Sequence, residues 1–406
     1  MWWDLRDLGN LSHALLDWVE GWAPGGLTYV VAGLIGIAGV LLFLIPSQLA
    51  VIWIERRMIA RLQHRLGPNR VGPFGLLQPI ADALKVLGKE AITPRASDRW
   101  LFWLAPIAIF VPAITVYAVL PFGPHMVMAD LNVALLLVIA LGATNALIVF
   151  MAGWSSNNKY SLLGAMRVVA MMVSYEVPQV LALLGVVLFV GSLSLQEIVF
   201  WQQGHRTLLL FLQPLSFLFF LIASLVELNR TPTDIAEAES EIVAGYHTEY
   251  SGFKFTLFYA AEYTNALAVA ALTATLYLGG WWLYGLERWV PGWLIFIGKI
   301  YLLFALMVWV RGTLPRLRID QLMALGWKFL LPVSLANVLL VALEVLLWQE
   351  LGLSAPVALT AFALGNYLLS ALLVVAWARL FLGPLSRRAP RVVLTKTVGH
   401  VLTEPS

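Results

Sequence analysis

Long, continuous apolar runs dominate the chain. A helix that spans a bilayer needs about 20 mostly apolar residues, and the runs predict nine such helices. The predicted spans are 27–54, 100–121, 131–153, 168–193, 207–226, 256–283, 291–310, 327–349 and 356–383. A transmembrane β-barrel would instead show alternating segments of about ten residues. We therefore expect an all-α polytopic membrane protein.

Composition supports this class. Of the 406 residues, 60% are hydrophobic and 12% are charged, whereas soluble domains carry about 25% charged residues. The 17 tryptophans suit membrane interfaces. Because there is no cysteine, disulfides and thiolate-bound zinc or iron–sulfur centres are excluded on this chain. The N-terminus lacks a basic segment and a small-residue cleavage site, so we expect no cleavable signal peptide.

The basic residues predict the orientation. Most of the 26 lysines and arginines lie in alternate connections, namely 55–99, 154–167, 227–255, 311–326 and the tail after 383. Basic loops stay on the cytoplasmic side. The N-terminus is therefore predicted outside and the C-terminus inside, and candidate chemistry concentrates in the long inner loops.

The first inner loop is basic and patterned. Arg57, Arg61 and Arg65 recur every four residues and predict one face of a helix that leaves the membrane. Two Gly-Pro corners within 67–75 then predict tight turns, and 76–87 predicts an amphipathic helix in the interface. A basic loop can serve simply to bind anionic lipid and fix topology. The two rigid corners favour a docking surface for soluble subunits and the mouth of a lipid-facing tunnel.

The third inner loop, 227–255, is acidic although the other inner loops are basic. Glu237 and Glu241 share a face if this segment is helical, and like charges at that spacing repel. At least one such carboxyl should have a raised pKa, and coupled carboxyls titrate as a group. A solvated acidic turn is the simpler interpretation. Because apolar residues are interleaved with the acids, a proton-holding cluster is favoured.

Several charges fall inside the predicted spans, where an ionised group costs roughly 2.5–3.5 kcal/mol or more. Glu176, Glu227 and Glu262 lie in the inner halves of their spans, at the depth of the acidic loop. Together they predict a carboxyl path for proton relay; structural ion pairs or interfacial anchors are the alternative. Lys299 and Glu344 are interpreted as partners or as snorkelling residues.

These motifs resemble those of the H-subunit family of respiratory complex I, the proton-pumping NADH:quinone oxidoreductase. The resemblance runs from about residue 40 to about 345, and its longer motifs are highly specific. The segments that carry it are Glu55–Lys89 with GPNRVGPFGLLQPIADALK, Gly153–Gly164, Ser174–Glu176, Asn229–Ser251 ending GYHTEYS, Ala261–Tyr263 and Arg311–Gln321.

The resemblance implies a multi-pass subunit of the inner (plasma) membrane that forms a quinone-binding chamber and couples quinone reduction to proton transfer. Quinone would be the substrate. This chain would bind no cofactor or metal, and FMN and iron–sulfur clusters would lie in partner subunits. Expected partners are peripheral-arm quinone-module subunits, small membrane-arm subunits and the lipid bilayer, with no nucleic acid. Residues 27–349 would form the family's membrane domain, with 1–26 a periplasmic segment and 350–406 an additional helix and basic tail.

Matched by motif, two groups of site residues are implied. The proton-funnel positions are Glu176, Glu227, Arg230, Asp234, Glu237, Glu239, Glu241 and Glu262. The positions at the chamber entrance are Arg56, Arg57, Arg61, Gly67, Pro68, Asn69, Arg70 and Phe74. The chain departs from the family at Thr233 and Ala236, which stand where a phenylalanine and a proline are usual.

Three other functions are the alternatives. A homologous subunit of a hydrogenase-type or ferredoxin-fed complex would share ancestry, but the GPNRVGP and GYHTEYS motifs favour the quinone enzyme. A stand-alone ion or solute carrier is disfavoured because no internal repeat is found. A passive scaffold for soluble subunits is disfavoured by the carboxyls within the spans.

Overall fold

The computed structural model describes residues 26–124, 126–235, 243–352 and 354–386, and every regular element in these ranges is helical. The prediction of an all-α membrane protein is confirmed. The longer helices are α2 (Gly26–Leu62), α3 (Gln78–Leu87), α4 (Arg99–Thr115), α5 (Ala134–Ser155), α6 (Lys159–Val190), α7 (Leu195–His205), α9 (Pro214–Glu227), α11 (Gly252–Tyr277), α12 (Gly292–Thr313), α14 (Leu331–Leu351) and α15 (Ala355–Ser386). The shorter ones are α8 (Leu209–Leu212) and α13 (Ile319–Ala324), with 3₁₀ turns at Pro73–Gly75, Val116–Ala118, Gly245–His247 and Leu286–Arg288.

Each predicted span coincides with one helix or with two consecutive ones. Within the described ranges, seven helices are long and apolar enough to cross a membrane. The fifth span is divided between α8 and the 14-residue α9, and the sixth corresponds to α11. The eighth is continuous from α13 to α14 through a π-helical turn, Leu325–Leu330. The total of nine and the orientation stay predictions.

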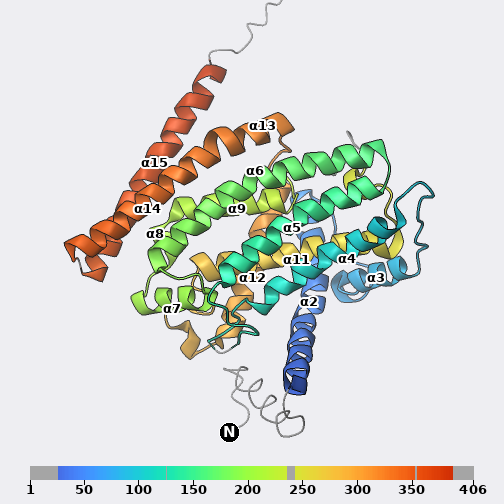
Figure 1. Cartoon of the computed structure of the whole chain (residues 1–406), viewed down its shortest axis with the longest axis horizontal. Helices are drawn as coiled ribbons and strands as arrows, with labels where there is room; N and C mark the ends of the chain where they lie inside the picture. The colour runs from blue at the N-terminus through green and yellow to red at the C-terminus, as the bar shows by residue number, and fades with distance from the viewer. Residues whose placement is uncertain (1–25, 125, 236–242, 353, 387–406) are drawn as a thin grey trace, which may run out of the picture.

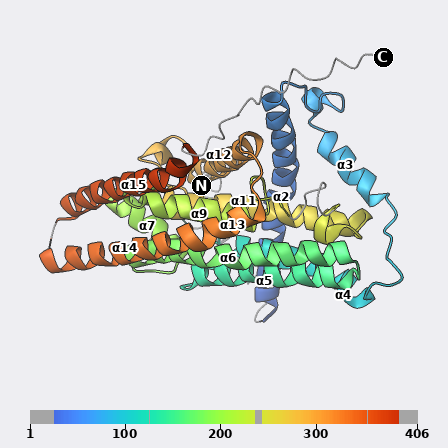
Figure 2. The same ribbon diagram turned by 90° about the horizontal axis from the view of Figure 1, so that it is seen from above.

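The helices form a bundle with α11 at its centre. α6 packs against α5, α9 and α14, while α11 packs against α4 and α12. In Figures 1 and 2, α2 crosses this bundle at a steep angle. From Ala266 to Tyr277 every residue of α11 is buried, and five of them are alanines. Small residues let neighbouring helix backbones approach closely in membranes, which explains why this helix can be enclosed.

The outer surface of the bundle is apolar. Leu42 of α2, Leu147 of α5 and Leu364 of α15 are each more than 70% exposed. Contiguous apolar surface of this kind is rare on soluble monomers and marks a membrane or partner contact. The exterior therefore suits a multi-pass membrane protein.

The first inner loop largely follows its predicted pattern. α3 forms the expected amphipathic helix. However, α2 ends at Leu62, and His64 has a φ of 53°, a left-handed conformation that a helix cannot continue through. Arg57 and Arg61 therefore share the helix, but Arg65 lies beyond its end. The prediction of one face carrying all three arginines is wrong for Arg65.

Candidate functional site

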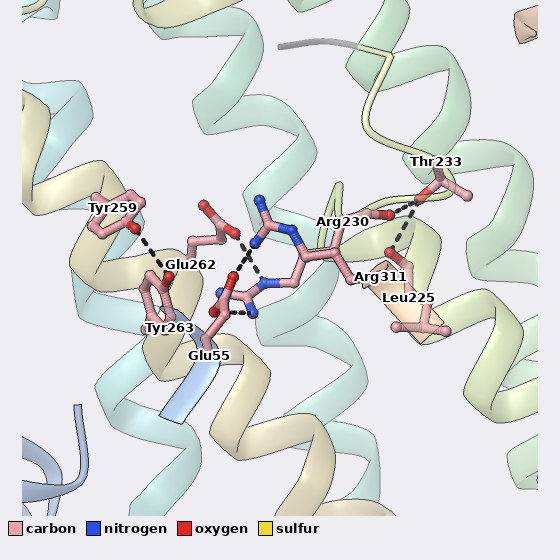
Figure 3. Close-up of polar contacts among 8 residues, drawn as sticks. All are labelled: Glu55, Leu225, Arg230, Thr233, Tyr259, Glu262, Tyr263 and Arg311. Carbon is pink, nitrogen blue, oxygen red and sulfur yellow. Dashed lines mark hydrogen bonds and ion pairs between the residues drawn. The ribbon is translucent and has the colours of Figure 1, made fainter. Parts of the chain in front are cut away.

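Four buried or partly buried charges from distant parts of the chain meet in the bundle (Figure 3). Arg230, in the loop after α9, donates through Nε to Glu262 Oε1 at 2.9 Å and through Nη1 to Glu55 Oε2 at 3.1 Å. Arg311 of α12 also pairs with Glu55. We call Glu55, Arg230, Glu262 and Arg311 the charge cluster. It joins α2, the α9 loop, α11 and α12 at one point.

Arg230 is the centre of the charge cluster, since its side chain is only 3% exposed. Its guanidinium lies 4.4 Å from the centre of the Tyr263 ring, an attractive geometry for a cation. Burial alone would lower the pKa of Arg230, but the charges of Glu262 and Glu55 outweigh this and raise it above its ordinary value. Arg230 is thus a permanent positive charge between two carboxyls.

The local sequence after α9 fixes the position of Arg230. Asn229 has a φ of 50°, a conformation that asparagine tolerates better than most residues, and it turns the chain back. Thr233 then donates its hydroxyl to the Arg230 carbonyl at 2.7 Å and lies 3.3 Å from the Leu225 carbonyl. Thr233, which departs from the family pattern, is therefore buried and holds the loop that presents Arg230.

A small cavity of about 100 Å³ lies beside the charge cluster, between α5, α6, α9 and α11. Glu176, Glu227 and Glu262 all line it, so the structure brings the three predicted carboxyls together. Gln179 donates to Glu227 Oε2 at 2.8 Å. At Gly142 an added Cβ would lie 2.9 Å from Glu227 Oε1, which shows how closely α5 approaches this carboxyl.

A large cavity of about 900 Å³ lies on the other side of the charge cluster, between α2, α3 and α11. Its polar lining includes Arg56, Asp82, Tyr259 and Tyr263, and the two tyrosine hydroxyls are 2.9 Å apart. Arg56 pairs with Asp82. Burial tends to raise the pKa of Asp82, but hydrogen bonds from Arg56 and Gln78 outweigh it and bring the pKa below its ordinary value.

α11 lies between the two cavities and contributes polar side chains to the lining of each. Glu262 lines the small cavity, whereas Tyr259 and Tyr263 line the large one. Arg230 contacts one lining residue of each cavity, since it forms an ion pair with Glu262 and lies over the Tyr263 ring. Two side-chain contacts, from Tyr263 to Arg230 and from Arg230 to Glu262, therefore join the linings of the two cavities.

The remaining predicted funnel residues have different outcomes. Asp234 lies in the same loop as Arg230 but pairs with a different arginine. Arg316 Nη2 is 3.2 Å from Asp234 Oδ2. Glu237, Glu239 and Glu241 lie outside the described residues. In the part of the chain that the structure describes, no group of three or more acidic or histidine side chains is arranged to hold a metal ion.

The predicted entrance residues gather where α2 ends. Arg57 donates to the Phe74 carbonyl at 2.9 Å, and its guanidinium also lies over the rings of Trp53 and Phe74. Gly67 packs against Arg57, since an added Cβ would lie 3.2 Å from the Arg57 Cα. Of the eight predicted residues, Arg56 lines the large cavity. Arg61 in the last turn of α2 is exposed, as are Asn69 and Arg70 in the loop that follows, while Pro68 is half-buried.

Sequence reasoning missed several residues of the site: Glu55, Gln179, Tyr259, Tyr263 and Arg311. Glu55 stands at the start of the basic loop. Because Arg56 and Arg57 follow it directly, the sequence predicts an exposed charged segment and gives no sign that Glu55 is buried. Lys299 and Glu344 are not partners. Lys299 donates to the carbonyls of Leu278, Gly280 and Trp282, so it caps the chain after α11.

The fold and site define a multi-pass helical membrane protein in which a charge cluster lies between a small cavity lined by three carboxyls and a larger, partly apolar cavity. Comparison with known proteins identifies its family. The chain matches the NADH dehydrogenase family over residues 35–342. It is similar to proteins from several bacteria that are named as the H subunit of NADH-quinone oxidoreductase.

The similarity covers most of each protein. The relative from Dehalococcoides mccartyi strain CBDB1 is 55% identical over 76% of this chain and 86% of its own length. The relative from Carboxydothermus hydrogenoformans is 47% identical over 84% and 97%, and that from Geobacillus kaustophilus is 48% identical over 80% and 97%. The chain therefore belongs to the H-subunit family of complex I, and it is a membrane subunit of an NADH:quinone oxidoreductase. The resemblance found in the sequence is confirmed.

Proposed function

We propose that this chain forms the quinone-binding chamber of a proton-translocating NADH:quinone oxidoreductase and transmits quinone reduction to a carboxyl path. It would act in the inner (plasma) membrane, beside peripheral-arm subunits that hold FMN and iron–sulfur clusters. The observation that carries the proposal is the placement of the charge cluster between the two cavities.

The large cavity suits a quinone headgroup and part of its tail. Ligand sites commonly enclose about 300–1,000 Å³ and combine an apolar lining with a few polar groups. Here Ile52, Val86 and Phe255 are among the apolar lining residues, and Tyr259 and Arg56 are among the polar ones. The cavity lies against α2 and α3, whose outer faces are apolar and exposed. Entry from the lipid would therefore need no passage through water.

Coupling would proceed through Arg230. Reduction of a quinone to a quinol takes up two electrons and two protons, and negative charge develops on the headgroup before protonation. Such a charge near Tyr263 would attract Arg230, whose guanidinium already contacts that ring. A weakened hold on Glu262 would favour proton uptake by that carboxyl, since a neighbouring cation stabilises the ionised form. Glu262 would then exchange protons with Glu227 and Glu176 across the small cavity.

The quinone site is tested by narrowing the large cavity. In Ala260→Phe the added ring would enter the space lined by Ala260. We expect the KM for a long-tailed quinone to rise, and labelling of α2, α3 and α11 by a photoreactive quinone analogue to fall. Ala305→Phe is the matched control, because Ala305 is also half-buried and lines neither cavity. Equal labelling of the two variants would refute the site.

The carboxyl path is tested by Glu227→Gln, which keeps the size of the side chain and removes its exchangeable proton. We expect the complex to assemble and the number of protons pumped per electron to fall. Assembly is checked by native gel electrophoresis, and pumping by proton uptake in closed vesicles. Normal pumping would favour the passive-scaffold alternative.

A further inference from the structure

A stripe of polar side chains follows α9 from the small cavity to its other end. The residues are Gln213, which directly precedes the helix, and Ser216, Ser224 and Glu227, which lie on one helical face because they are separated by eight and three residues. Toward α6, Gln179 Nε2 lies 3.3 Å from Ser224 Oγ, Ser216 donates to the Ala182 carbonyl at 2.6 Å, and Gln213 donates to the Gly185 carbonyl at 3.0 Å. The stripe is therefore buried between two helices.

The apolar side chain of Phe220 lies between Ser216 and Ser224 on this face. The small cavity extends alongside Phe220. Phe220 and Leu276 both line the cavity that contains Glu227. The next residue of α11, Tyr277, has its hydroxyl 3.1 Å from Ser216 Oγ. A cavity of about 100 Å³ is large enough for several waters. The cavity therefore extends from Glu227 to Phe220, which is one helical turn from Ser216, and water in the cavity would bridge this step of the stripe.

The stripe then meets α14 beside Gly185, a residue of α6. A Cβ at this glycine would lie 3.4 Å from Gln213 Oε1, 3.6 Å from Ser216 Oγ and 3.8 Å from Asn337 Nδ2. Gln213 Oε1 is buried and, within the described part of the chain, accepts no hydrogen bond. Asn337 lies on α14 two helical turns before Glu344, on the same buried face.

Glu344 is a buried carboxyl bound by an amide from α15. Asn366 Nδ2 lies 3.0 and 3.1 Å from the two oxygens of Glu344 and 2.9 Å from the Leu212 carbonyl. Asn366 is 1% exposed and Glu344 is 7% exposed. Among the described residues, no basic side chain forms an ion pair with Glu344.

This arrangement suits a carboxyl that carries a proton. An isolated charge in the bilayer interior is costly. Asn366 Oδ1 is buried and has no hydrogen-bond partner among the described residues. A protonated Glu344 can donate to that oxygen after a small turn of the amide, so that each group donates once and accepts once. An ionised Glu344 leaves Asn366 Oδ1 unsatisfied.

We propose that Glu344 holds an exchangeable proton, and that α15, through Asn366, completes the far end of a polar stripe along which protons leave Glu227. The family match ends at residue 342, so both Glu344 and α15 lie beyond it. The proposal rests on the proposed function for its proton source. The proton moves from Glu227 along the stripe to Glu344 and then to solvent at the opposite end of the bundle.

The test compares Glu344→Gln with Glu350→Gln in the complete complex. Glu350 is on the same helix and exposed, so it controls for loss of a carboxyl. In infrared spectra of the wild-type complex, we expect a protonated-carboxyl band that shifts in D₂O, is lost in E344Q and stays in E350Q. In vesicles, E344Q should pump fewer protons per electron, while its electron transfer with an uncoupler stays at the wild-type rate.

Two results would overturn the proposal. One is a spectrum in which E344Q retains every protonated-carboxyl band of the wild type, since the group would then be ionised. The other is an unchanged number of protons per electron in E344Q. The uncoupled electron-transfer rate of E344Q shows whether the variant complex is assembled, so a loss of pumping is distinguished from a loss of the complex. Loss of pumping in Glu227→Gln with normal pumping in E344Q would refute this inference and leave the proposed function standing.

Discussion

Removing the guanidinium of Arg230 should destabilise the protein strongly. In Arg230→Met the partly buried Glu262 loses its ion-pair partner at 2.9 Å, whereas Glu55 keeps Arg311. Breaking a buried pair by removing one partner costs about 3–5 kcal/mol, because the remaining charge is left without compensation. We expect most of that cost to arise from Glu262.

The assay is the temperature at which the purified complex loses its native-gel band. We expect Arg230→Met to lower it clearly, and the double variant Arg230→Met with Glu262→Gln to recover part of the loss, since neighbouring groups couple by about 0.5–3 kcal/mol. Arg56→Met is the control. It breaks an ion pair whose side chains are 41% and 37% exposed, and such pairs contribute about 0–1 kcal/mol.

Two outcomes would refute this reasoning. If Arg230→Met were as stable as Arg56→Met, the charge cluster would not be desolvated as the structure has it. If the double variant were less stable than the single one, the uncompensated Glu262 could not be the cause. Arg230→Lys is also expected to destabilise, because one ammonium cannot reproduce the planar, forked contacts of a guanidinium.

Three further predictions concern single residues. Burial lowers the pKa of His247 to about 4. As pH falls below about 6.5, the unfolded chain therefore binds a proton at this residue before the folded protein does, and the folded state loses stability. The thermal midpoint should drop between pH 7 and 5, and the drop should be smaller in His247→Gln. Gly75→Ala should reduce assembly with soluble subunits, measured on native gels, because its Cβ would lie 2.2 Å from the Pro68 carbonyl; Gly88→Ala, with its nearest atom at 3.8 Å, should assemble normally. Lys299→Met should lower the thermal midpoint, because three carbonyls lose a charged donor. Each such hydrogen bond contributes about 1.5–3 kcal/mol. An unchanged midpoint would show that these carbonyls find other hydrogen-bond donors.

The helical fold and the carboxyl cluster could be predicted from the sequence because both follow from local rules. Apolar runs of sufficient length give spans, and each predicted span corresponds to one helix or two consecutive ones. Glu176, Glu227 and Glu262 stood out because a charge within an apolar run is costly. Their common depth was enough to predict that they meet.

The partners of these charges could not be predicted in the same way. Glu55 and Arg311 are 256 residues apart, and nothing in the spacing along a chain fixes which charges from separate helices will pair. Tyr259 and Tyr263 looked like ordinary residues of an apolar helix, and only the packing of α2 and α3 on α11 makes them part of a cavity wall. The sequence also did not predict that α2 ends at Leu62, because this end depends on the positive φ angle of His64.

The charge cluster has a consequence for how the chain is made. Glu55 leaves the ribosome 175 residues before Arg230 and 256 residues before Arg311. During the first of these intervals neither of the two arginines that pair with its carboxylate in the folded protein has been synthesised. The charge cluster is complete only when α12 has been synthesised, so in a polypeptide that stops before Arg311 the carboxylate of Glu55 would have Arg230 as its single partner from the cluster.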